Sequence, residues 1–241
     1  MAVLQELALL GIVFTGAEGP PPDLVGRLFA GPAKGALTAA ADSGLAAAEA
    51  AALRPDWIVG DMDSLDSETR LAAYPAERVI RHGAAKDHTD TELALSLLWE
   101  KGCDEVWLLG GGGGRTDHLF AIRSLFERAR FPCRWITGAE DIRCLAARPD
   151  GGISPGGPAA GRAAAAPAEL ALGLEKDALL SVFPLGNGPW KAVSRGLAWP
   201  LDRLRWDRGF FGLSNVAESG ELLIRAERGR FMVIIPGLRH L

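Results

Sequence analysis

Apolar and polar positions along the first 140 residues repeat a pattern of a short apolar run followed by a longer helix-like stretch. The apolar runs predict strands at residues 9–14, 36–41, 57–59, 78–80, 105–109 and 134–137. Alanine-rich or amphipathic stretches between them predict helices at residues 45–53, 92–101 and 118–130. Strands that alternate with helices indicate a mostly parallel sheet that is covered on both faces and binds ligands at the carboxyl ends of its strands.

The pattern changes after residue 140, where short apolar runs are separated by turns and no clear helical period is visible. These runs cover residues 142–146, 178–183, 196–200, 222–226 and 231–235. The glycines and prolines between them favour a small antiparallel sandwich or barrel. We therefore expect an α/β domain over residues 1–140 and an all-β sandwich domain over residues 141–241. Residues 148–167 are nearly all Gly, Ala and Pro and predict a flexible loop.

Composition narrows the class of protein. With 241 residues and 48% apolar content, the chain can bury one large core or two smaller ones. The longest N-terminal apolar run, residues 3–14, is too short to cross a bilayer, so we expect a soluble, cytoplasmic protein without membrane contact. The cysteines Cys103, Cys133 and Cys144 are widely spaced and predict buried free thiols in a reducing compartment.

Charge is distributed unevenly along the chain. Residues 1–140 carry 13 basic and 20 acidic side chains, a net charge of −7, whereas residues 141–241 carry 13 and 10, a net charge of +3. An acidic first half favours a cation site over a nucleic-acid surface, so no nucleic-acid partner is expected.

Six aspartates in the first half lie at predicted strand-to-helix junctions, which suggests a magnesium and nucleotide site. They are Asp42, Asp61, Asp63, Asp87, Asp90 and Asp117. Asp61 and Asp63 form the densest pair, because an apolar run places them two residues apart on a turn that opens with Gly60. Mg²⁺ often uses one or two carboxylates together with substrate phosphates, so this pair is half of a suitable site. The alternative is a surface turn whose aspartates cap helices, and capping alone also explains Asp42.

A second motif, Lys86-Asp87-His88-Thr89-Asp90, precedes a helical run. A helix N-terminus favours anions, a lysine can hold a phosphate, and the two aspartates can add metal ligands. The alternative assigns Thr89 or Asp90 as the N-cap and leaves the lysine and the histidine in solvent.

A third motif is the run of five glycines at residues 110–114, which follows an apolar strand and precedes a predicted helix. Backbone N–H groups in such a loop can approach a phosphate, and Arg115 can add a bidentate contact. The spacing is not that of a P-loop and matches the dinucleotide fingerprint only loosely. A flexible linker is the alternative, but the tight junction with a buried strand favours a functional loop.

Tryptophan is frequent for a chain of this length, with seven residues. Four of them lie in apolar element patterns and are expected in the core: Trp57, Trp99, Trp107 and Trp135. Three lie near Gly and Pro in the second half and are candidates for stacking on a flat ligand or for a subunit interface: Trp190, Trp199 and Trp206.

Together, and in this order, the motifs resemble those of thiamine pyrophosphokinases. The resemblance runs through residues 41–44, 55–64, 86–90, 113–118, 196–201 and 212–215. It spans most of the chain, and the ordered set is far more specific than any single member.

The resemblance implies an α/β catalytic domain, a β-sandwich domain and a homodimer with thiamine bound near the subunit interface. It implies Mg²⁺-dependent transfer of the β,γ-pyrophosphoryl unit of ATP to the thiamine hydroxyl, with release of AMP. The implied magnesium ligands are Asp61, Asp63, Asp87 and Asp90. The implied ATP contacts are Lys86, Asp87, Thr89, Asp90, Gly113, Gly114, Arg115 and His118, with Asp117 completing that site. Ser214 and Asn215 would face thiamine, and Asp42 or Asp117 would accept the proton of the hydroxyl.

The chain departs from the family pattern at three places. The Gly-Gly turn after the first strand is replaced by residues 15–19, Met62 stands where Phe is common, and Val216 stands where an acidic residue is usual. Met62 keeps an apolar side chain between the paired aspartates. Val216 lies near the implied acceptor site, which keeps open a pyrophosphokinase for another hydroxymethyl heterocycle such as a pterin. A non-catalytic nucleotide-binding sensor on the same fold is a further alternative.

Overall fold

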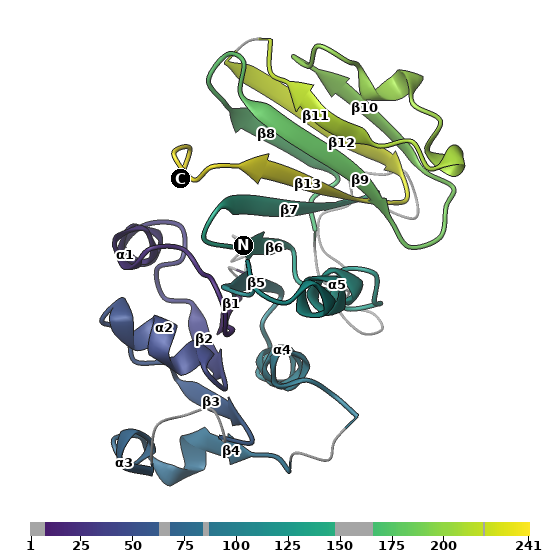
Figure 1. Cartoon of the computed structure of the whole chain (residues 1–241). Helices are drawn as coiled ribbons and strands as arrows, with labels where there is room; N and C mark the ends of the chain where they lie inside the picture. The colour runs from purple at the N-terminus through teal and green to yellow at the C-terminus, as the bar shows by residue number, and fades with distance from the viewer. Residues whose placement is uncertain (1–7, 63–67, 84–86, 148–165, 219) are drawn as a thin grey trace, which may run out of the picture. The chain divides into compact units, whose positions relative to one another are not determined.

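The computed structural model describes residues 8–62, 68–83, 87–147, 166–218 and 220–241 (Figure 1). The chain divides into two compact units. Unit 1 consists of Met1–Ile122 and Ile136–Gly138, and unit 2 of Arg123–Trp135 and Ala139–Leu241. Two predicted site residues, Asp63 and Lys86, and nearly all of the predicted loop at 148–167 lie outside the described residues.

Unit 1 contains a parallel sheet with the strand order β5–β1–β2–β3–β4. Its strands are β1 (Leu10–Phe14), β2 (Leu37–Ala41), β3 (Trp57–Gly60), β4 (Val79–Arg81) and β5 (Glu105–Leu109). β1, β2, β3 and β5 are almost continuously buried, as expected for parallel strands with helices on both faces. All five strand predictions are confirmed to within one residue at each end.

Helices connect these strands on both faces of the sheet. They are α1 (Pro22–Ala30), α2 (Gly44–Ala50), α3 (Glu68–Leu71), the 3-10 turn η1 (Ala76–Arg78), α4 (Asp90–Glu100) and α5 (Thr116–Leu125). Figure 1 shows α2 on one side of β2 and α4 on the other. Sequence patterns missed α1, which begins with a proline at its first position, where the missing N–H costs nothing. The predicted α/β fold is confirmed.

The order of the strands reverses direction between β1 and β5. From β1 the chain adds β2, β3 and β4 one after another on one side, and β5 then pairs with the other side of β1. In open α/β sheets such a reversal opens a crevice outside the carboxyl ends of the two strands, where ligands bind. A ligand-binding site is therefore expected at the loops after β1 and β5.

Unit 2 contains antiparallel strands in two sheets, with the orders β11–β9–β13–β7 and β10–β12–β8. The strands are β7 (Glu140–Ala146), β8 (Glu169–Gly173), β9 (Leu179–Leu185), β10 (Lys191–Arg195), β11 (Gly212–Val216), β12 (Glu221–Arg228) and β13 (Arg230–Pro236). Side chains from both sheets share one buried cluster that includes Val182, Ile224 and Phe231. This packing confirms the predicted all-β sandwich. The short elements β6 (Arg134–Ile136), η2 (Leu201–Arg203) and η3 (Trp206–Arg208) complete the list.

The strand predicted at residues 196–200 is wrong. This segment is a bend with one isolated bridge, from Leu197 to Ala217. Gly196 has a φ of +81°, which leaves the extended conformation, and the preceding segment forms β10 instead. β10 has only two apolar residues, Ala192 and Val193, between polar ones and gave no clear strand signal.

The cysteine prediction is confirmed, because Cys103, Cys133 and Cys144 are all buried and free. Trp206 is only 5% exposed and packs edge-on against Phe231 with ring centroids 5.0 Å apart, so its prediction as a stacking or interface residue is wrong. Within the described residues, no helix has the length and the apolar composition needed to span a membrane.

Candidate active site

The loops after β1 and β5 are joined by backbone hydrogen bonds at the carboxyl edge of the sheet. Glu18 and Gly112 exchange two of them, with N···O distances of 3.0 and 2.9 Å, and the Gly111 N–H donates to the Gly16 carbonyl at 2.8 Å. A β-carbon at Gly110 would lie 2.2 Å from the Thr15 carbonyl oxygen, so this approach requires glycine. The glycine loop is held in place, and the linker alternative is excluded.

Two aspartates from distant parts of the chain approach the end of β3. A β-carbon at Gly60 would lie 3.2 Å from Asp42 Cβ and 3.3 Å from Asp90 Oδ1. Asp42 follows β2 in a turn with a φ of +48°, and its N–H donates to the Val59 carbonyl at 2.9 Å. Since Ser43, and not Asp42, is the N-cap residue of α2, capping does not explain Asp42.

The donors at this edge suit a magnesium ion. Asp90 Oδ1 and the α- and β-carbons of Asp42 lie against Gly60, and the half-buried Asp61 follows directly. Within the described residues, which exclude Asp63, no three acidic, histidine or cysteine side chains lie close enough to form a complete metal site. Two carboxylates with room for phosphate oxygens and water match the way proteins bind Mg²⁺.

The N-terminus of α4 positions Asp90. Thr89 is the N-cap: its Oγ1 accepts from the Glu92 N–H at 3.3 Å, and its own N–H donates to Glu92 Oε2 at 2.7 Å. The capping alternative is therefore correct for Thr89, and Asp90 begins the helix. Asp87 and His88 are exposed, and His88 Nδ1 lies 3.6 Å from Glu92 Oε1.

A hydroxyl contact that sequence patterns missed ties this helix to β1. Thr15 Oγ1 and Thr91 Oγ1 lie 2.7 Å apart, and the Thr15 N–H donates to the Leu109 carbonyl at 2.9 Å. Thr15 thus joins β1, β5 and α4 at the point where the carboxylates meet. The signal available in the sequence was its place as the first polar residue after an apolar strand.

Arg115 and Asp117 form an exposed ion pair at the start of α5. Arg115 Nε and Nη2 donate to the two carboxylate oxygens at 3.1 and 2.5 Å, and the side chains are 72% and 60% exposed. The hydrogen bonds from Arg115 lower the pKa of Asp117. The His118 N–H also donates to Asp117, at 3.1 Å, while its side chain is exposed. Gly113 and Gly114 precede this pair with φ angles of +61° and +63°.

Ser214 and Asn215, the predicted thiamine contacts, lie on β11 in unit 2. Ser214 is exposed with a φ of +52°, and its N–H donates to Ser181 Oγ at 3.0 Å. Asn215 is buried, and its side chain exchanges hydrogen bonds of 3.1 and 2.7 Å with the main chain of Trp199. Asn215 thereby fixes Trp199, which is 61% exposed.

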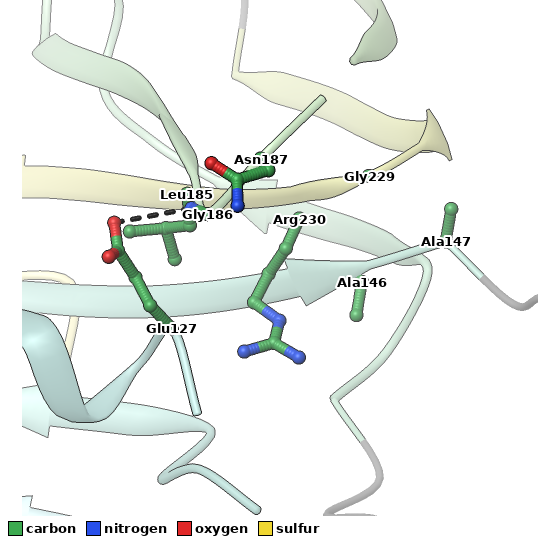
Figure 2. A pocket seen from close by; sticks show the side chains of 8 residues that line it. All are labelled: Glu127, Ala146, Ala147, Leu185, Gly186, Asn187, Gly229 and Arg230. Atoms are coloured by element: carbon green, nitrogen blue, oxygen red, sulfur yellow. Dashed lines mark hydrogen bonds between the residues drawn. The ribbon is translucent and has the colours of Figure 1, made fainter. Parts of the chain in front are cut away.

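Unit 2 also contains a cavity of about 310 Å³, shown in Figure 2. It is lined by Glu127, Ala146, Ala147, Leu185, Gly186, Asn187, Gly229 and Arg230. Its charged groups already serve the fold: Glu127 accepts from the Gly186 N–H at 3.2 Å and from Arg123 at 2.8 Å, and Arg230 donates to the Arg128 carbonyl at 2.8 Å. None of the predicted site residues lies in it.

The fold and the site define a doubly wound α/β domain with carboxylates and a glycine loop at its switch point, followed by a β-sandwich. Residues 33–135 match the family model described as "Thiamin pyrophosphokinase, catalytic domain". This range holds Asp42, Gly60, Asp90 and Arg115. A thiamine pyrophosphokinase of Bacillus subtilis (strain 168) is 36% identical over 127 residues, and the match covers 49% of this chain and 54% of that relative.

Solved structures of thiamin pyrophosphokinases share the fold over nearly the whole chain. The thiamin pyrophosphokinase of Geobacillus thermodenitrificans has a TM-score of 0.67 at 20% identity, with 96% of this chain and 98% of that chain covered. The thiamine pyrophosphokinase of Bacillus subtilis has a TM-score of 0.67 at 21% identity, with 95% of this chain and 99% of that chain covered. The yeast thiamin pyrophosphokinase has a TM-score of 0.61 at 14% identity, with 98% of this chain and 88% of that chain covered. Together with the family model, these matches confirm the resemblance to thiamine pyrophosphokinases.

Proposed function

We propose that this protein is a magnesium-dependent ATP:thiamine pyrophosphokinase that forms thiamine diphosphate and AMP. The observation that carries the proposal is the approach of Asp42 and Asp90 to Gly60 within the segment that matches the catalytic-domain model. The matched relatives do not support the pterin-directed or the non-catalytic alternative.

Positioning and charge neutralisation account for most of the catalysis of such a transfer. Asp42, Asp90 and Asp61, with Asp63 and Asp87 as further candidates, would hold Mg²⁺, which neutralises the triphosphate. The hydroxyl contact between Thr15 and Thr91 keeps the first turn of α4, and with it Asp90, at the carboxyl edge.

Arg115 would exchange its partner during the reaction. In the structure its guanidinium binds Asp117, and a phosphate is an equally suitable bidentate partner. When Arg115 turns to the nucleotide, Asp117 loses the contact that lowers its pKa and becomes a better proton acceptor. Asp117, or Asp42 where Asp61 and Asp90 hold the metal without it, would take the proton of the acceptor hydroxyl. Lys86, Gly113, Gly114 and His118 complete the proposed nucleotide contacts.

Unit 2 would serve the acceptor and the assembly of a homodimer. Five large apolar side chains around β11 are between 46% and 66% exposed: Leu179, Trp199, Phe210, Phe211 and Leu213. Exposed apolar groups of this number favour an interface between copies. Ser214 on β11 and Trp199, which the neighbouring Asn215 fixes, would face thiamine. A Leu213→Glu variant is expected to be monomeric by light scattering, whereas an unchanged mass would contradict the dimer surface.

The cellular setting follows from the same chemistry. Three free buried thiols suit the reducing cytoplasm, and the acidic first half does not suit a nucleic acid. We therefore propose a cytoplasmic enzyme whose partners are ATP, thiamine and a second copy of the chain.

The proposal is tested by neutralising the converging carboxylates. Asp42→Asn and Asp90→Asn should each lower thiamine diphosphate formation by about a hundredfold or more, because metal and phosphate lose a ligand. Glu77→Gln is the matched control, since Glu77 is exposed on the turn before β4, at the opposite edge of the sheet. A hydroxymethylpterin is offered in parallel as acceptor. Near-normal turnover in both aspartate variants, or transfer to the pterin alone, would contradict the proposal.

A further inference from the structure

We propose that Glu18 makes nucleotide binding at the glycine loop conditional on a divalent cation. Its carboxylate lies on the loop that would receive the phosphates and repels a polyphosphate that arrives without a cation. This inference rests on the proposed function and adds a residue that neither the sequence motifs nor the family resemblance assigns. Glu18 belongs to the segment at residues 15–19 that replaces the Gly-Gly turn.

The side chain of Glu18 lies directly against Gly113. A β-carbon at Gly113 would be 2.5 Å from Glu18 Cδ, 2.7 Å from Oε2 and 2.9 Å from Oε1. The carboxylate therefore occupies the space beside the α-carbon of the loop, next to Gly114 and Arg115 in the chain. Any other residue at position 113 would displace it.

The main chain, not the carboxylate, holds Glu18 in this place. Its N–H and carbonyl both bond to Gly112, whereas no hydrogen bond or ion pair binds the carboxylate within the part of the chain that the structure describes. Glu18 is exposed, so its carboxylate is in contact with solvent. A role in stability would require a partner for the side chain, and here the backbone supplies the contacts.

Electrostatics then favours one form of the nucleotide over the other. Glu18 places a carboxylate against the glycine loop after β5, in addition to Asp42 and Asp90 beside Gly60 at the end of β3. Repulsion scales with the charge of the ligand, and a magnesium complex carries two fewer negative charges than the free polyphosphate. A cation between Glu18 and a phosphate also turns part of the repulsion into attraction. Glu18 therefore penalises the metal-free ligand more than the complex.

Binding of a nonhydrolysable ATP analogue, measured by calorimetry on the full chain, tests the inference without turnover. Titrations are run in excess chelator and in excess Mg²⁺ for the wild type, for Glu18→Gln and for the control Glu77→Gln. Glu18→Gln keeps the shape of the side chain and the backbone bonds. It should bind the metal-free analogue about fivefold more tightly, with a change of about twofold or less for the magnesium complex. Glu77→Gln should match the wild type in both.

The possible outcomes separate the inference from the function on which it rests. A ratio of metal-free to magnesium dissociation constants that falls in Glu18→Gln alone supports the inference. The same ratio in all three proteins, with clear binding in Mg²⁺, overturns the role of Glu18 and leaves the proposed function intact. Absence of binding in the wild type under both conditions overturns both. A ratio that rises in Glu18→Gln shows Glu18 to be a contact needed for binding and also overturns the inference.

Discussion

Arginine–aspartate pairs occur in both units, in opposite surroundings. In unit 1, Arg115 and Asp117 are 72% and 60% exposed and have no further ionic partner among the described residues. In unit 2, Arg134 and Asp141 are 4% and 0% exposed, with Nε···Oδ1 at 2.7 Å and Nη2···Oδ2 at 3.0 Å. The two pairs consist of the same residue types and differ in burial. Exposure allows Arg115 to change its partner, whereas burial fixes Arg134 within the fold.

The surroundings of Asp141 show how such a pair is fixed. Burial alone would raise the pKa of Asp141, but hydrogen bonds from His240 and Arg134 and the charges of Arg143 and Arg134 outweigh it and hold the pKa well below its usual range. Arg143 Nε lies 2.8 Å and His240 Nε2 3.1 Å from Asp141 Oδ2. Every oxygen of the carboxylate is engaged, so the cluster belongs to the structure of unit 2 and is unsuited to binding a ligand.

The largest effect is expected when the buried pair is broken. Asp141→Asn removes the carboxylate that pairs with the buried Arg134 and should lower the free energy of unfolding by about 3–5 kcal/mol, measured by urea denaturation at pH 7. Because the folded-state pKa of Asp141 is lowered, its contribution is present above the unfolded pKa of about 3.9 and is lost as the pH falls below it. The free energies of unfolding of the wild type and of the variant should therefore become equal in acid. Asp117→Asn is the matched control and should leave the unfolding midpoint unchanged; equal effects of the two substitutions would contradict the comparison.

Loss of the exposed pair should lower the activity and leave the stability unchanged. Arg115→Ala is expected to lower thiamine diphosphate formation by about a hundredfold, since a bidentate phosphate contact is lost, while the unfolding midpoint stays unchanged. Arg115→Lys should recover only part of the rate, because a lysine keeps the charge and loses the planar fork. Arg27→Ala is the control, as Arg27 forms an exposed ion pair with Asp23 at 2.8 Å on α1. A normal rate in Arg115→Ala would show that the pair has no part in the reaction.

A third cluster, around Tyr74, is intermediate in exposure between the two arginine–aspartate pairs. Its disruption should have the smallest effect of the three. Tyr74 donates to Glu49 Oε1 at 3.2 Å, and Arg70 lies 3.1 Å from Glu49 Oε2. Burial, followed by the charge and the hydrogen bond of Glu49, raises the pKa of Tyr74 to about 12. A raised pKa means that the stabilising contact is complete below pH 10 and is lost as the pH approaches the folded value.

Tyr74 is the sole tyrosine of the chain, so its ultraviolet absorbance reports this ionisation directly. The wild type should titrate near pH 12, and Glu49→Gln should shift the midpoint toward 10. A titration midpoint near pH 10 in the wild type would show that the Tyr74 hydroxyl is in water. It would contradict the contact between Tyr74 and Glu49.

Strands β1, β2, β3 and β5 could be predicted because each is a short apolar run, and burial on both faces leaves little else for such runs to form. The segment at 196–200 misled the prediction, since its apolar residues pack in a bend after Gly196. β10 was missed because Lys191, Ser194 and Arg195 hide its alternation at a sheet edge.

The candidate site was predictable in its residue types and less so in its geometry. The motifs named Asp42 and Asp90 separately, and only the sheet topology brings residues 48 positions apart over the same glycine. Thr15 and Glu18 carried no motif, because their roles depend on the loop after β5 lying beside the loop after β1. Asn215 was predicted as a ligand contact, and its buried amide bonds show that it also fixes Trp199.

The central claim is that the carboxyl edge of unit 1 directs transfer of a pyrophosphoryl unit and not of a single phosphoryl group. The most direct test uses ATP labelled with ³²P at the β-phosphorus, together with thiamine, Mg²⁺ and the full chain. The account predicts that the label appears in thiamine diphosphate in step with unlabelled AMP. Label that remains in the nucleotide as ADP would contradict it.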